Sequence, residues 1–381
     1  MILGAEEKPQ PLGFILLAAF VALLGWYFVT SFLERQVSWQ AQAKLLTGHD
    51  DLFAIDGRRD GTQAAVGRFG MILLTRDGGK TWQEQPSGTS RALSAISFAD
   101  HQHGFIAGSG GTILTTSDGG VTWRAQAAGT EEQLLGVHAS SPTAAHVVGA
   151  FGTLLFTSDG GATWRKQELS WDRLIPLIAK DSGILEPNLN FVYFVNPETG
   201  WIVGEFGLVL KTTDGGRTWT SQTYGGDRPQ LFAVMFRDKL TGWSVGQQGA
   251  VLKTTDGGRN WIAVDIGIRR NLYGISFQAE HGLIVGEGIV LASQDAGSNW
   301  RKLESVPEER WLSGAAIRNR QAIVVGQAGT IRVLDLNPST RAPCSTGGSR
   351  SGFRPTGLLE GATGLPVELH KKISRREAAA R

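Results

Sequence analysis

The chain is poor in the residues that supply covalent cross-links. It has 381 residues and one cysteine, Cys344. A single thiol excludes an intrachain disulfide and any metal site built on several cysteines. The chain also has little excess of either charge. Its formal net charge is only +2, which gives no indication of nucleic-acid binding. Packing and hydrogen bonds must therefore hold the fold together.

Long uncharged runs are equally scarce, and the clear example lies near the N-terminus. Residues 11–33, PLGFILLAAFVALLGWYFVTSFL, carry no charge and meet the length of about 20 apolar residues that a spanning helix needs. A cleaved signal peptide is the alternative. Its apolar region is typically about 7–15 residues long, and Ala41-Gln42-Ala43 offers a cleavage site. The length favours an uncleaved transmembrane signal anchor after a short N-terminal segment, residues 1–10.

Glycine, in contrast, is abundant, with 51 residues beside a hydrophobic content of 41%. That composition is typical of a large all-β domain with many tight turns. A recurrent motif agrees: a small or β-branched residue, Gly, a short turn and then an apolar strand, as in VVGAFGTLLFT and SVGQQGAVLKT. Its leading glycines are Gly67, Gly108, Gly149, Gly204, Gly246, Gly286 and Gly326. Seven units about 40 residues apart predict a seven-bladed β-propeller.

A second motif, Ser/Thr-x-Asp-x-Gly-x-x-Trp, recurs six times. We expect the Asp carboxylate to accept hydrogen bonds from its own turn, the glycine to supply positive φ, and the Trp to pack beside the next strand. The unit SQDAGSNW has Ala296 before Gly297, which predicts that the second glycine position holds the positive φ. The structural residues of this motif are Asp77, Asp118, Asp159, Asp214, Asp256 and Asp295, with Trp82, Trp123, Trp164, Trp219, Trp261 and Trp300.

The two motifs together resemble the Asp-box (BNR) repeats of sialidases and sortilin-type receptors, and most of all those of the photosystem II stability/assembly factor family, over residues 38–336. The resemblance implies a seven-bladed propeller whose Asp boxes are structural. It also implies photosystem II as partner and an arginine-rich patch in the photosynthetic members. Here the residues after the leading glycines are mixed, namely Arg68, Ser109, Ala150, Glu205, Gln247, Glu287 and Gln327. A non-photosynthetic bacterial relative that serves a transporter-like complex therefore stays an alternative.

The last repeat unit, residues 312–336, ends early. It provides three strands and no Asp box, whereas SWQAQ, Ser38–Gln42, matches TWRAQ, Thr122–Gln126, the outer strand of the second unit. We therefore expect residues 38–44 to complete the last blade and to cover its edge. Residues 337–381 are rich in Pro, Ser, Gly, Arg and Thr and form a low-complexity basic tail that cannot bury a core.

Partner binding is predicted on one face of the propeller. Hairpins between second and third strands share that face with the links between blades, and loops on a rigid scaffold are where binding residues concentrate. The wide spacing before Gly204 marks an insertion within residues 169–188, and long loops are often functional. Its alternative role is structural, with Trp171, Ile175 and Leu177 folding it onto the propeller. Because Trp and Arg are enriched at interface hot spots, the candidates are Arg68, Arg91, Trp171, Arg173, Arg228, Arg269, Arg270 and Trp311.

Other chemistries fit the sequence less well. One carboxylate per turn does not make an EF-hand calcium loop, and His101 and His103 lack further zinc ligands nearby, so we expect no metal and no cofactor. A sialidase-like glycoside hydrolase or a glycan-binding propeller remains the alternative, since exceptional glycosidases use a Tyr nucleophile. However, Tyr193 and Tyr273 lie in inner-strand patterns, where an aromatic residue is usually core.

The sequence as a whole predicts a non-catalytic, membrane-anchored scaffold that binds protein and assists the assembly or stability of a membrane complex. That partner is an integral membrane protein of photosystem II or of a transporter-like complex, and nucleic acid is not expected. We expect the propeller on the extracytoplasmic side, in the bacterial periplasm or, in a photosynthetic host, in the thylakoid lumen.

Overall fold

The computed structural model describes residues 50–57, 61–175, 180–222, 224, 227–303, 310–318 and 320–336. The N-terminal segment 1–10, the expected anchor 11–33, the expected closing strand 38–44 and the tail 337–381 lie outside these residues. Among the helices of the described part, none has the length and hydropathy that crossing a membrane requires.

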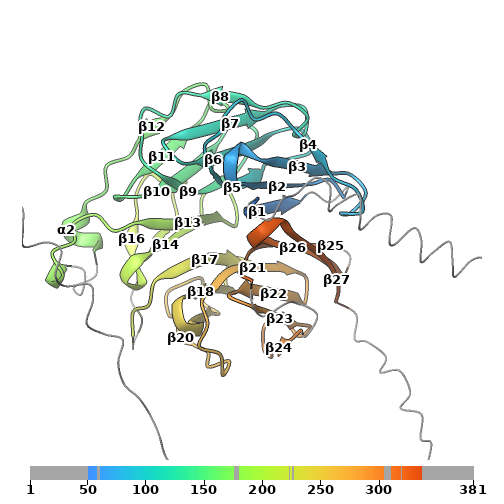
Figure 1. Ribbon diagram of the computed structural model, residues 1–381. Coiled ribbons are helices and arrows are strands. Elements are labelled where there is room, and N and C mark those ends of the chain that lie inside the picture. The colour runs from blue at the N-terminus through green and yellow to red at the C-terminus, as the bar shows by residue number, and fades with distance from the viewer. Residues whose placement is uncertain are drawn as a thin grey trace, which may run out of the picture. The chain divides into compact units, whose positions relative to one another are not determined.

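Seven antiparallel sheets are arranged radially as the blades of a β-propeller (Figure 1). In each sheet the strands follow one another in chain order. The first three blades are β1 (Leu52–Gly57), β2 (Gln63–Gly67), β3 (Ile72–Thr75) and β4 (Gln83–Glu84); β5 (Leu93–Phe98), β6 (Gly104–Gly108), β7 (Thr112–Thr116) and β8 (Arg124–Gln126); and β9 (Leu134–Ala139), β10 (Ala145–Gly149), β11 (Leu154–Thr157) and β12 (Arg165–Lys166).

The remaining blades repeat this order. They are β13 (Leu189–Phe194), β14 (Gly200–Gly204), β15 (Val209–Thr212) and β16 (Thr220–Ser221); β17 (Leu231–Phe236), β18 (Gly242–Gly246), β19 (Val251–Thr254) and β20 (Ile262–Ala263); β21 (Leu272–Gln278), β22 (His281–Gly286), β23 (Ile289–Ser293) and β24 (Arg301–Lys302); and β25 (Leu312–Arg318), β26 (Gln321–Gly326) and β27 (Thr330–Asp335). The predicted all-β, seven-bladed fold is thus confirmed.

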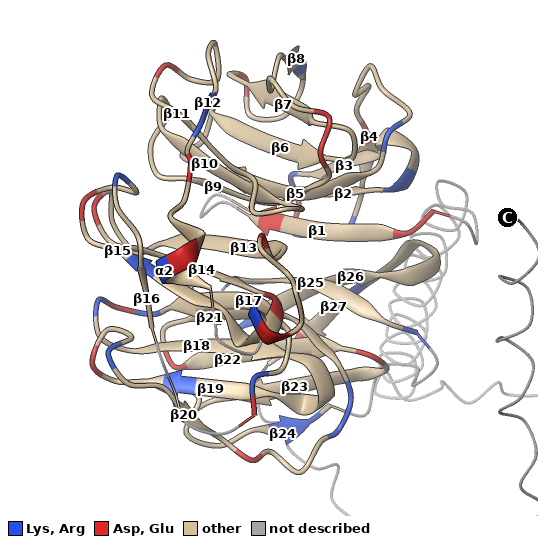
Figure 2. Cartoon of the chain, turned by 90° about the vertical axis from the view of Figure 1, so that its left-hand side faces the viewer, with Lys and Arg blue, Asp and Glu red and all other residues tan. Residues whose placement is uncertain are grey.

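Burial changes from the second strand of a blade to the fourth. Every residue of the second strands β2, β6, β10, β14 and β18 is buried, because these strands have neighbours within the sheet and in both adjacent blades. The fourth strands are short and exposed. Several carry Lys and Arg, as in β24, which is blue in Figure 2. Short charged strands at a sheet edge discourage pairing with other chains.

The core is divided into clusters that lie between neighbouring blades. Aromatic stacking is prominent: Trp201 of β14 stacks on Phe236 of β17 with 3.4 Å between ring centroids, and Trp243 of β18 stacks on Phe277 of β21 at 4.2 Å. Hydrogen bonds also cross between blades near the inner strands. The backbone N–H of Phe98 donates to Oδ2 of Asp56 at 2.7 Å.

The ring closes where the last blade meets the first (Figure 1). Leu52 and Ile55 of β1 share a buried cluster with Ala316 and Ile323 of the last blade. The Ser313 hydroxyl donates to the carbonyl of Leu52 at 2.9 Å. Three strands form this last blade in the described part of the chain, as the early end of the seventh repeat predicted.

The insertion between the third and fourth blades contains the short helix α2 (Trp171–Leu174). Leu174 and Ile175 are buried at 7% exposure each. Trp171 is half-buried and lies against Gly152, where an added Cβ would come within 2.5 Å of its ring. These contacts hold this part of the insertion against the propeller, which is the structural role that the sequence left open for Trp171 and Ile175. Leu177, the third residue of that alternative, lies outside the described residues.

Candidate protein-binding face

One face of the propeller, here called the turn face, carries the hairpins that join second and third strands. In the first blade, Phe69 (φ 57°) and Gly70 (φ 75°) occupy the centre of the turn, and Met71 N–H donates to the Arg68 carbonyl at 3.1 Å. Positive φ at both central positions defines a type I′ turn, the preferred tight turn of a β-hairpin. The first central position has positive φ in six blades, at Phe69, Gly110, Phe151, Phe206, Gln248 and Ala328. In the sixth blade Gly286 pairs directly with Ile289, and Gly288, the second residue of this shorter turn, has positive φ.

The links between blades pack on these turns, as the sequence predicted. A Cβ added to Gly70 would lie 1.9 Å from the carbonyl oxygen of Thr89, and one added to Gly249 would lie 1.9 Å from that of Ile268. Gly288 N–H donates to the carbonyl of Arg310 at 2.9 Å. Turns and links therefore form one continuous face.

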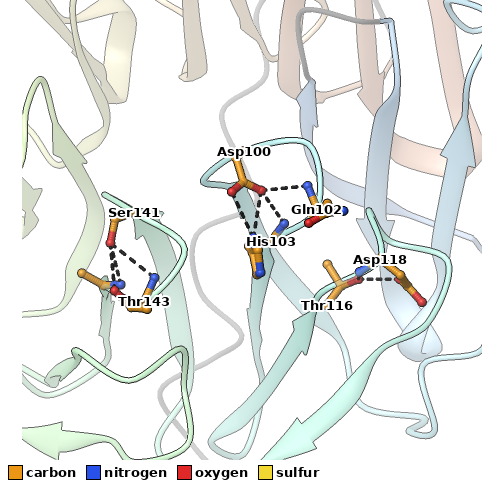
Figure 3. Close-up of polar contacts among 8 residues, drawn as sticks. Asp100, Gln102, His103, Thr116, Asp118, Ser141 and Thr143 are labelled. Atoms are coloured by element: carbon orange, nitrogen blue, oxygen red, sulfur yellow. Dashed lines mark hydrogen bonds and ion pairs between the residues drawn. The ribbon is translucent and has the colours of Figure 1, made fainter.

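The opposite face carries the Asp boxes. In the third blade, Asp159 Oδ1 accepts hydrogen bonds from the Thr157 hydroxyl (2.8 Å) and the Thr163 N–H (2.9 Å), while Oδ2 accepts one from the Thr163 hydroxyl (2.6 Å). Led by the Thr163 hydroxyl, these bonds lower the pKa of Asp159 to about 2. The same contact joins Thr116 to Asp118 at 2.8 Å, beside the hairpins of Asp100 and Ser141 (Figure 3). The carboxylate thus accepts hydrogen bonds from its own turn, as the structural interpretation of the Asp box predicts.

The donor four residues after each Asp was missed by the sequence reasoning. Thr81, Thr122, Thr163, Thr218, Asn260 and Asn299 each donate a side-chain hydrogen bond to Oδ2 of their box Asp. Only Thr or Asn occupies this position, so the signal was present in the repeat alignment.

One prediction about the box glycines is half wrong. Gly297 has positive φ (71°), as expected, but Ala296 has it too (56°). The second position differs from the first in packing. A Cβ at Gly297 would lie 2.8 Å from the ring of Trp243, whereas a Cβ at Gly78, a first-position glycine, meets nothing within 4 Å. Gly78 therefore leaves room for a methyl group, whereas Gly297 does not.

The structure places the eight predicted binding residues around the turn face rather than in one patch. Arg68 lies 3.3 Å from Asp51, Arg91 donates to the Gly110 carbonyl, Trp171 covers Gly152, and Arg173 lies 3.8 Å from Asp172. Arg228 lies 5.4 Å above the Tyr224 ring, Arg269 lies 3.3 Å from Asp265, Arg270 donates to the Gly288 carbonyl at 3.2 Å, and Trp311 stacks on Phe53 at 6.0 Å.

Arg270 and Trp311, from different links, lie close to one another. Arg270 donates to the carbonyl of Glu287 at 3.3 Å, and Glu287 forms a β-bridge with Trp311. Trp311 also occupies a repeat position that the sequence reasoning did not recognise. Its carbonyl accepts from Gln327 N–H at 3.0 Å, just as that of Asp51 accepts from Arg68 N–H at 2.8 Å. Most of the candidate arginines bind carbonyls or carboxylates of their own chain.

The channel on the propeller axis was not anticipated as a site. It has a volume of about 730 Å³, within the range of about 300–1,000 Å³ that ligand pockets usually have. Asp56 and His138 are its titratable lining groups besides Tyr193 and Tyr273. Burial lowers the pKa of His138 to about 4, so this imidazole is neutral at pH 7.

The two tyrosines considered for glycosidase chemistry both lie on inner strands. Tyr193 donates to the carbonyl of Phe236 at 2.9 Å, and burial raises its pKa to about 12. Tyr193 and Tyr273 were both expected in the core, but both are partly exposed and line the channel. Asp56 is the one carboxylate among the channel-lining residues, and hydrolysis of a glycoside by the usual routes needs a carboxylate pair. No group of three metal-ligating side chains occurs in the part of the chain that the structure describes.

Fold and site together define a class: an Asp-box β-propeller whose loops are presented on one face. The chain matches the family model described as the photosynthesis system II assembly factor YCF48, over residues 87–174, 123–229 and 226–333. These matches span most of the propeller, and the chain belongs to this family.

Solved structures agree on the fold. A structure described as YCF48 bound to D1 peptide is 18% identical with a TM-score of 0.59, covering 75% of this chain and 92% of that one. YCF48 from Cyanidioschyzon merolae is 21% identical, with a TM-score of 0.61 and coverages of 74% and 94%. The GH74 enzyme of Niastella koreensis is 16% identical at a TM-score of 0.61, covering 77% of this chain and 53% of the enzyme. No curated protein sequence matches the chain.

Proposed function

We propose that this protein is a non-catalytic scaffold that binds a membrane protein through its turn face and assists the assembly or stability of a membrane complex, as the family description implies. The observation that carries the proposal is apolar exposure at the turn tips. Phe69 and Phe151 are 60% and 64% exposed. Both residues lie at the first central position of their turns, with positive φ (57° and 50°).

A polypeptide partner fits this surface. Large apolar side chains held on a rigid frame suit protein contact, and a family relative has been solved with a D1 peptide. Nothing in the comparisons favours a transporter-like complex. An anchor at residues 11–33 would hold the turn face near a membrane partner and raise its local concentration. The propeller would then lie on the extracytoplasmic side of the membrane.

A catalytic role receives less support. The GH74 structures share the fold at identities of 15% and 16%, which carries no residue roles to this chain. Hydrolysis of a fluorogenic sialoside or of xyloglucan by the purified protein, abolished by Asp56→Asn, would favour the enzyme alternative and contradict the scaffold.

The scaffold is tested by crosslinking and mass spectrometry on native membranes. The variant Phe69→Ser, Phe151→Ser, Arg269→Ser removes exposed side chains from the turn face. Its matched control is Leu240→Ser, Ile262→Ser, which removes side chains that are 58% and 69% exposed on the Asp-box side and the outer strand β20. We expect crosslinks from the turn face to one membrane protein, lost in the first variant and kept in the second. Crosslinks that survive the first variant and disappear in the control would contradict the choice of face.

A further inference from the structure

All seven inner strands share an irregularity at the same residue. In each blade a fully buried leucine (Leu52, Leu93, Leu134, Leu189, Leu231, Leu272 and Leu312) is followed by a one-residue shift in the register with the second strand. The extra residues are Phe53, Ser94, Leu135, Asn190, Phe232, Tyr273 and Ser313. Such bulges redirect a side chain and are over-represented next to functional sites.

These seven residues, here called the bulge ring, lie at the turn-face end of the channel. Leu52 pairs with Gly67, the residue just before the first turn. The bulge at Phe53 therefore lies next to that turn. All seven line the channel and are partly exposed, whereas the leucines before them are 0% exposed. In every blade, therefore, a leucine that packs in the core is followed by a residue whose type varies and whose side chain lines the channel.

The bulge ring contains no charged side chain. Four of its members are large and mainly apolar: Phe53, Leu135, Phe232 and Tyr273. Phe53 stacks on Trp311, and Phe232 lies 5.3 Å from Tyr273 between ring centroids. Two of the polar members bind neighbouring blades, because Asn190 Nδ2 donates to the Leu231 carbonyl at 2.7 Å and Ser313 to that of Leu52. A charged group held within the ring would lose hydration, and the seven ring residues themselves supply no counter-charge.

The surroundings of the opening indicate a ligand larger than a small molecule. Phe69 and Phe151 present exposed rings on the same face, and a ligand confined to the channel would leave them in water. A polypeptide that lies across the face can cover them and insert one side chain into the opening. Aromatic anchors that fill a central pocket are the usual hot spots of protein interfaces.

We propose that the bulge ring is the central binding site for the partner protein and accepts one uncharged, apolar side chain of that partner, aromatic or branched aliphatic. This inference deepens the proposed function and rests on it for the identity of the ligand as a protein. It replaces the arginines as the principal anchor of the face.

The site is tested with neutral side-chain analogues on the full-length protein in lipid nanodiscs. Binding of N-acetyl-tryptophanamide and N-acetyl-leucinamide is followed by saturation-transfer NMR, with N-acetyl-lysinamide and empty nanodiscs as controls. We expect the neutral analogues to bind in the millimolar range and the lysine analogue not to bind. The variant Ser94→Asp places a charge in the ring with little change in volume and should weaken binding at least tenfold. Ser90→Asp, an exposed residue in the adjoining link, is the matched control and should bind like the unmodified protein.

The partner is tested separately by photo-crosslinking in native membranes. p-Benzoylphenylalanine is placed at Phe232 in the ring or, as control, at the exposed outer-strand residue Ile262. We expect crosslinks to a membrane protein from Phe232 only, and their loss when Ser94→Asp is added. A thermal melt of each variant checks that the propeller is folded.

The two experiments separate the inference from the proposed function. Partner crosslinks from turn-face residues that persist in Ser94→Asp, with none from Phe232, would overturn the ring as the site and leave the scaffold in place. Analogue binding that depends on the ring, with no protein crosslinked from any turn-face position, would retain the apolar site and contradict a protein partner. Equal analogue binding by Ser94→Asp and the unmodified protein would refute the inference.

Discussion

At the scale of single residues, the Asp box separates two requirements that look alike in the sequence. Both glycine positions of the turn need positive φ, which costs a residue with a Cβ about 1–2 kcal/mol. Gly297, at the second position of its box, also lies against the preceding blade, where it faces the indole of Trp243, whereas Gly78, at the first position of its box, lies in open space. Conformation therefore favours glycine at both positions, and packing adds a second requirement at Gly297.

This difference predicts unequal costs for the same substitution. Gly78→Ala should lower the free energy of unfolding by about 1 kcal/mol, since open space surrounds the new methyl group. Gly297→Ala should lower it by about 2–4 kcal/mol, because overpacking against a buried indole adds about 1–3 kcal/mol. Urea unfolding followed by tryptophan fluorescence measures both. Equal losses in the two variants would show that backbone conformation alone explains the glycines.

The bulge ring shows why part of the site escaped sequence reasoning at the residue scale. The leucine before each bulge is a fixed, buried residue and could be aligned. The residue after it varies between blades, as Phe53, Ser94 and Asn190 do. Nothing in the sequence periodicity indicates that this residue interrupts the alternation of inward and outward side chains along the strand. A bulge is a property of strand pairing, so the side chains that it redirects become visible only in the paired sheet.

At the scale of secondary-structure elements, the third strand of the last blade is the irregular one. In the first blade β3 pairs with β4 through Leu73 and Glu84 and through Leu74 and Gln83. In the last blade β27 carries Arg332 and Val333 at the corresponding places, and Val333 is 45% exposed. No fourth strand pairs with β27 among the described residues. An exposed apolar side chain on an edge strand invites pairing, and the match between SWQAQ and TWRAQ supplies the candidate.

The register of the expected closing strand follows from the repeat. Aligning Trp39 with Trp82 places Gln40 opposite Val333, as Gln83 lies opposite Leu74. Directly opposed residues of antiparallel strands are close enough for a disulfide. We therefore expect the double variant Gln40→Cys, Val333→Cys, made with Cys344→Ser, to oxidise to an intrachain disulfide.

The control for this disulfide pairs Gln40→Cys with Val121→Cys, an exposed residue of the second blade. Electrophoresis with and without reductant, and peptide mapping, detect the bond. Comparable oxidation in the two double variants, or none with Val333→Cys, would mean that residues 38–44 do not pair with β27 in this register.

At the scale of the whole molecule, the repeat carried most of the prediction. Blade number, strand order and the two faces follow from the spacing of seven glycines, because the same packing problem is solved seven times. The side chains of the proposed site differ between blades although their position repeats, as Phe53, Ser94 and Asn190 do. The arginines chosen by residue type proved to be engaged with their own chain, as with Arg91 and Gly110, whereas the channel arises only when all blades are assembled.

The assembled ring also determines how stability responds to acid. His138 and His146 are packed between the third and fourth blades around Phe194. Burial lowers the pKa of His138 to about 4, and burial followed by repulsion from His138 lowers that of His146 to about 3. Below about pH 6.5 these histidines are protonated in the unfolded chain but stay neutral in the folded chain. The free energy of unfolding therefore falls as the pH drops from 6.5 towards 4, by roughly 2–3 kcal/mol per histidine.

The Asp boxes respond in a lower range. The pKa of Asp159 is about 2 in the folded protein against an ordinary 3.8. Its contribution to the free energy of unfolding is therefore complete above pH 3.8 and is lost as the pH falls from 3.8 to 2.

Two variants separate the histidines from the Asp boxes. We expect His146→Phe to flatten the decline in stability between pH 6.5 and 4, since Phe105 fills the corresponding place against the box glycine Gly161 of the next blade. Asp159→Asn should change only the lower range. Urea unfolding at a series of pH values measures both, and a His146→Phe curve parallel to that of the unmodified protein above pH 4 would show that buried histidines do not set the acid limit of the ring.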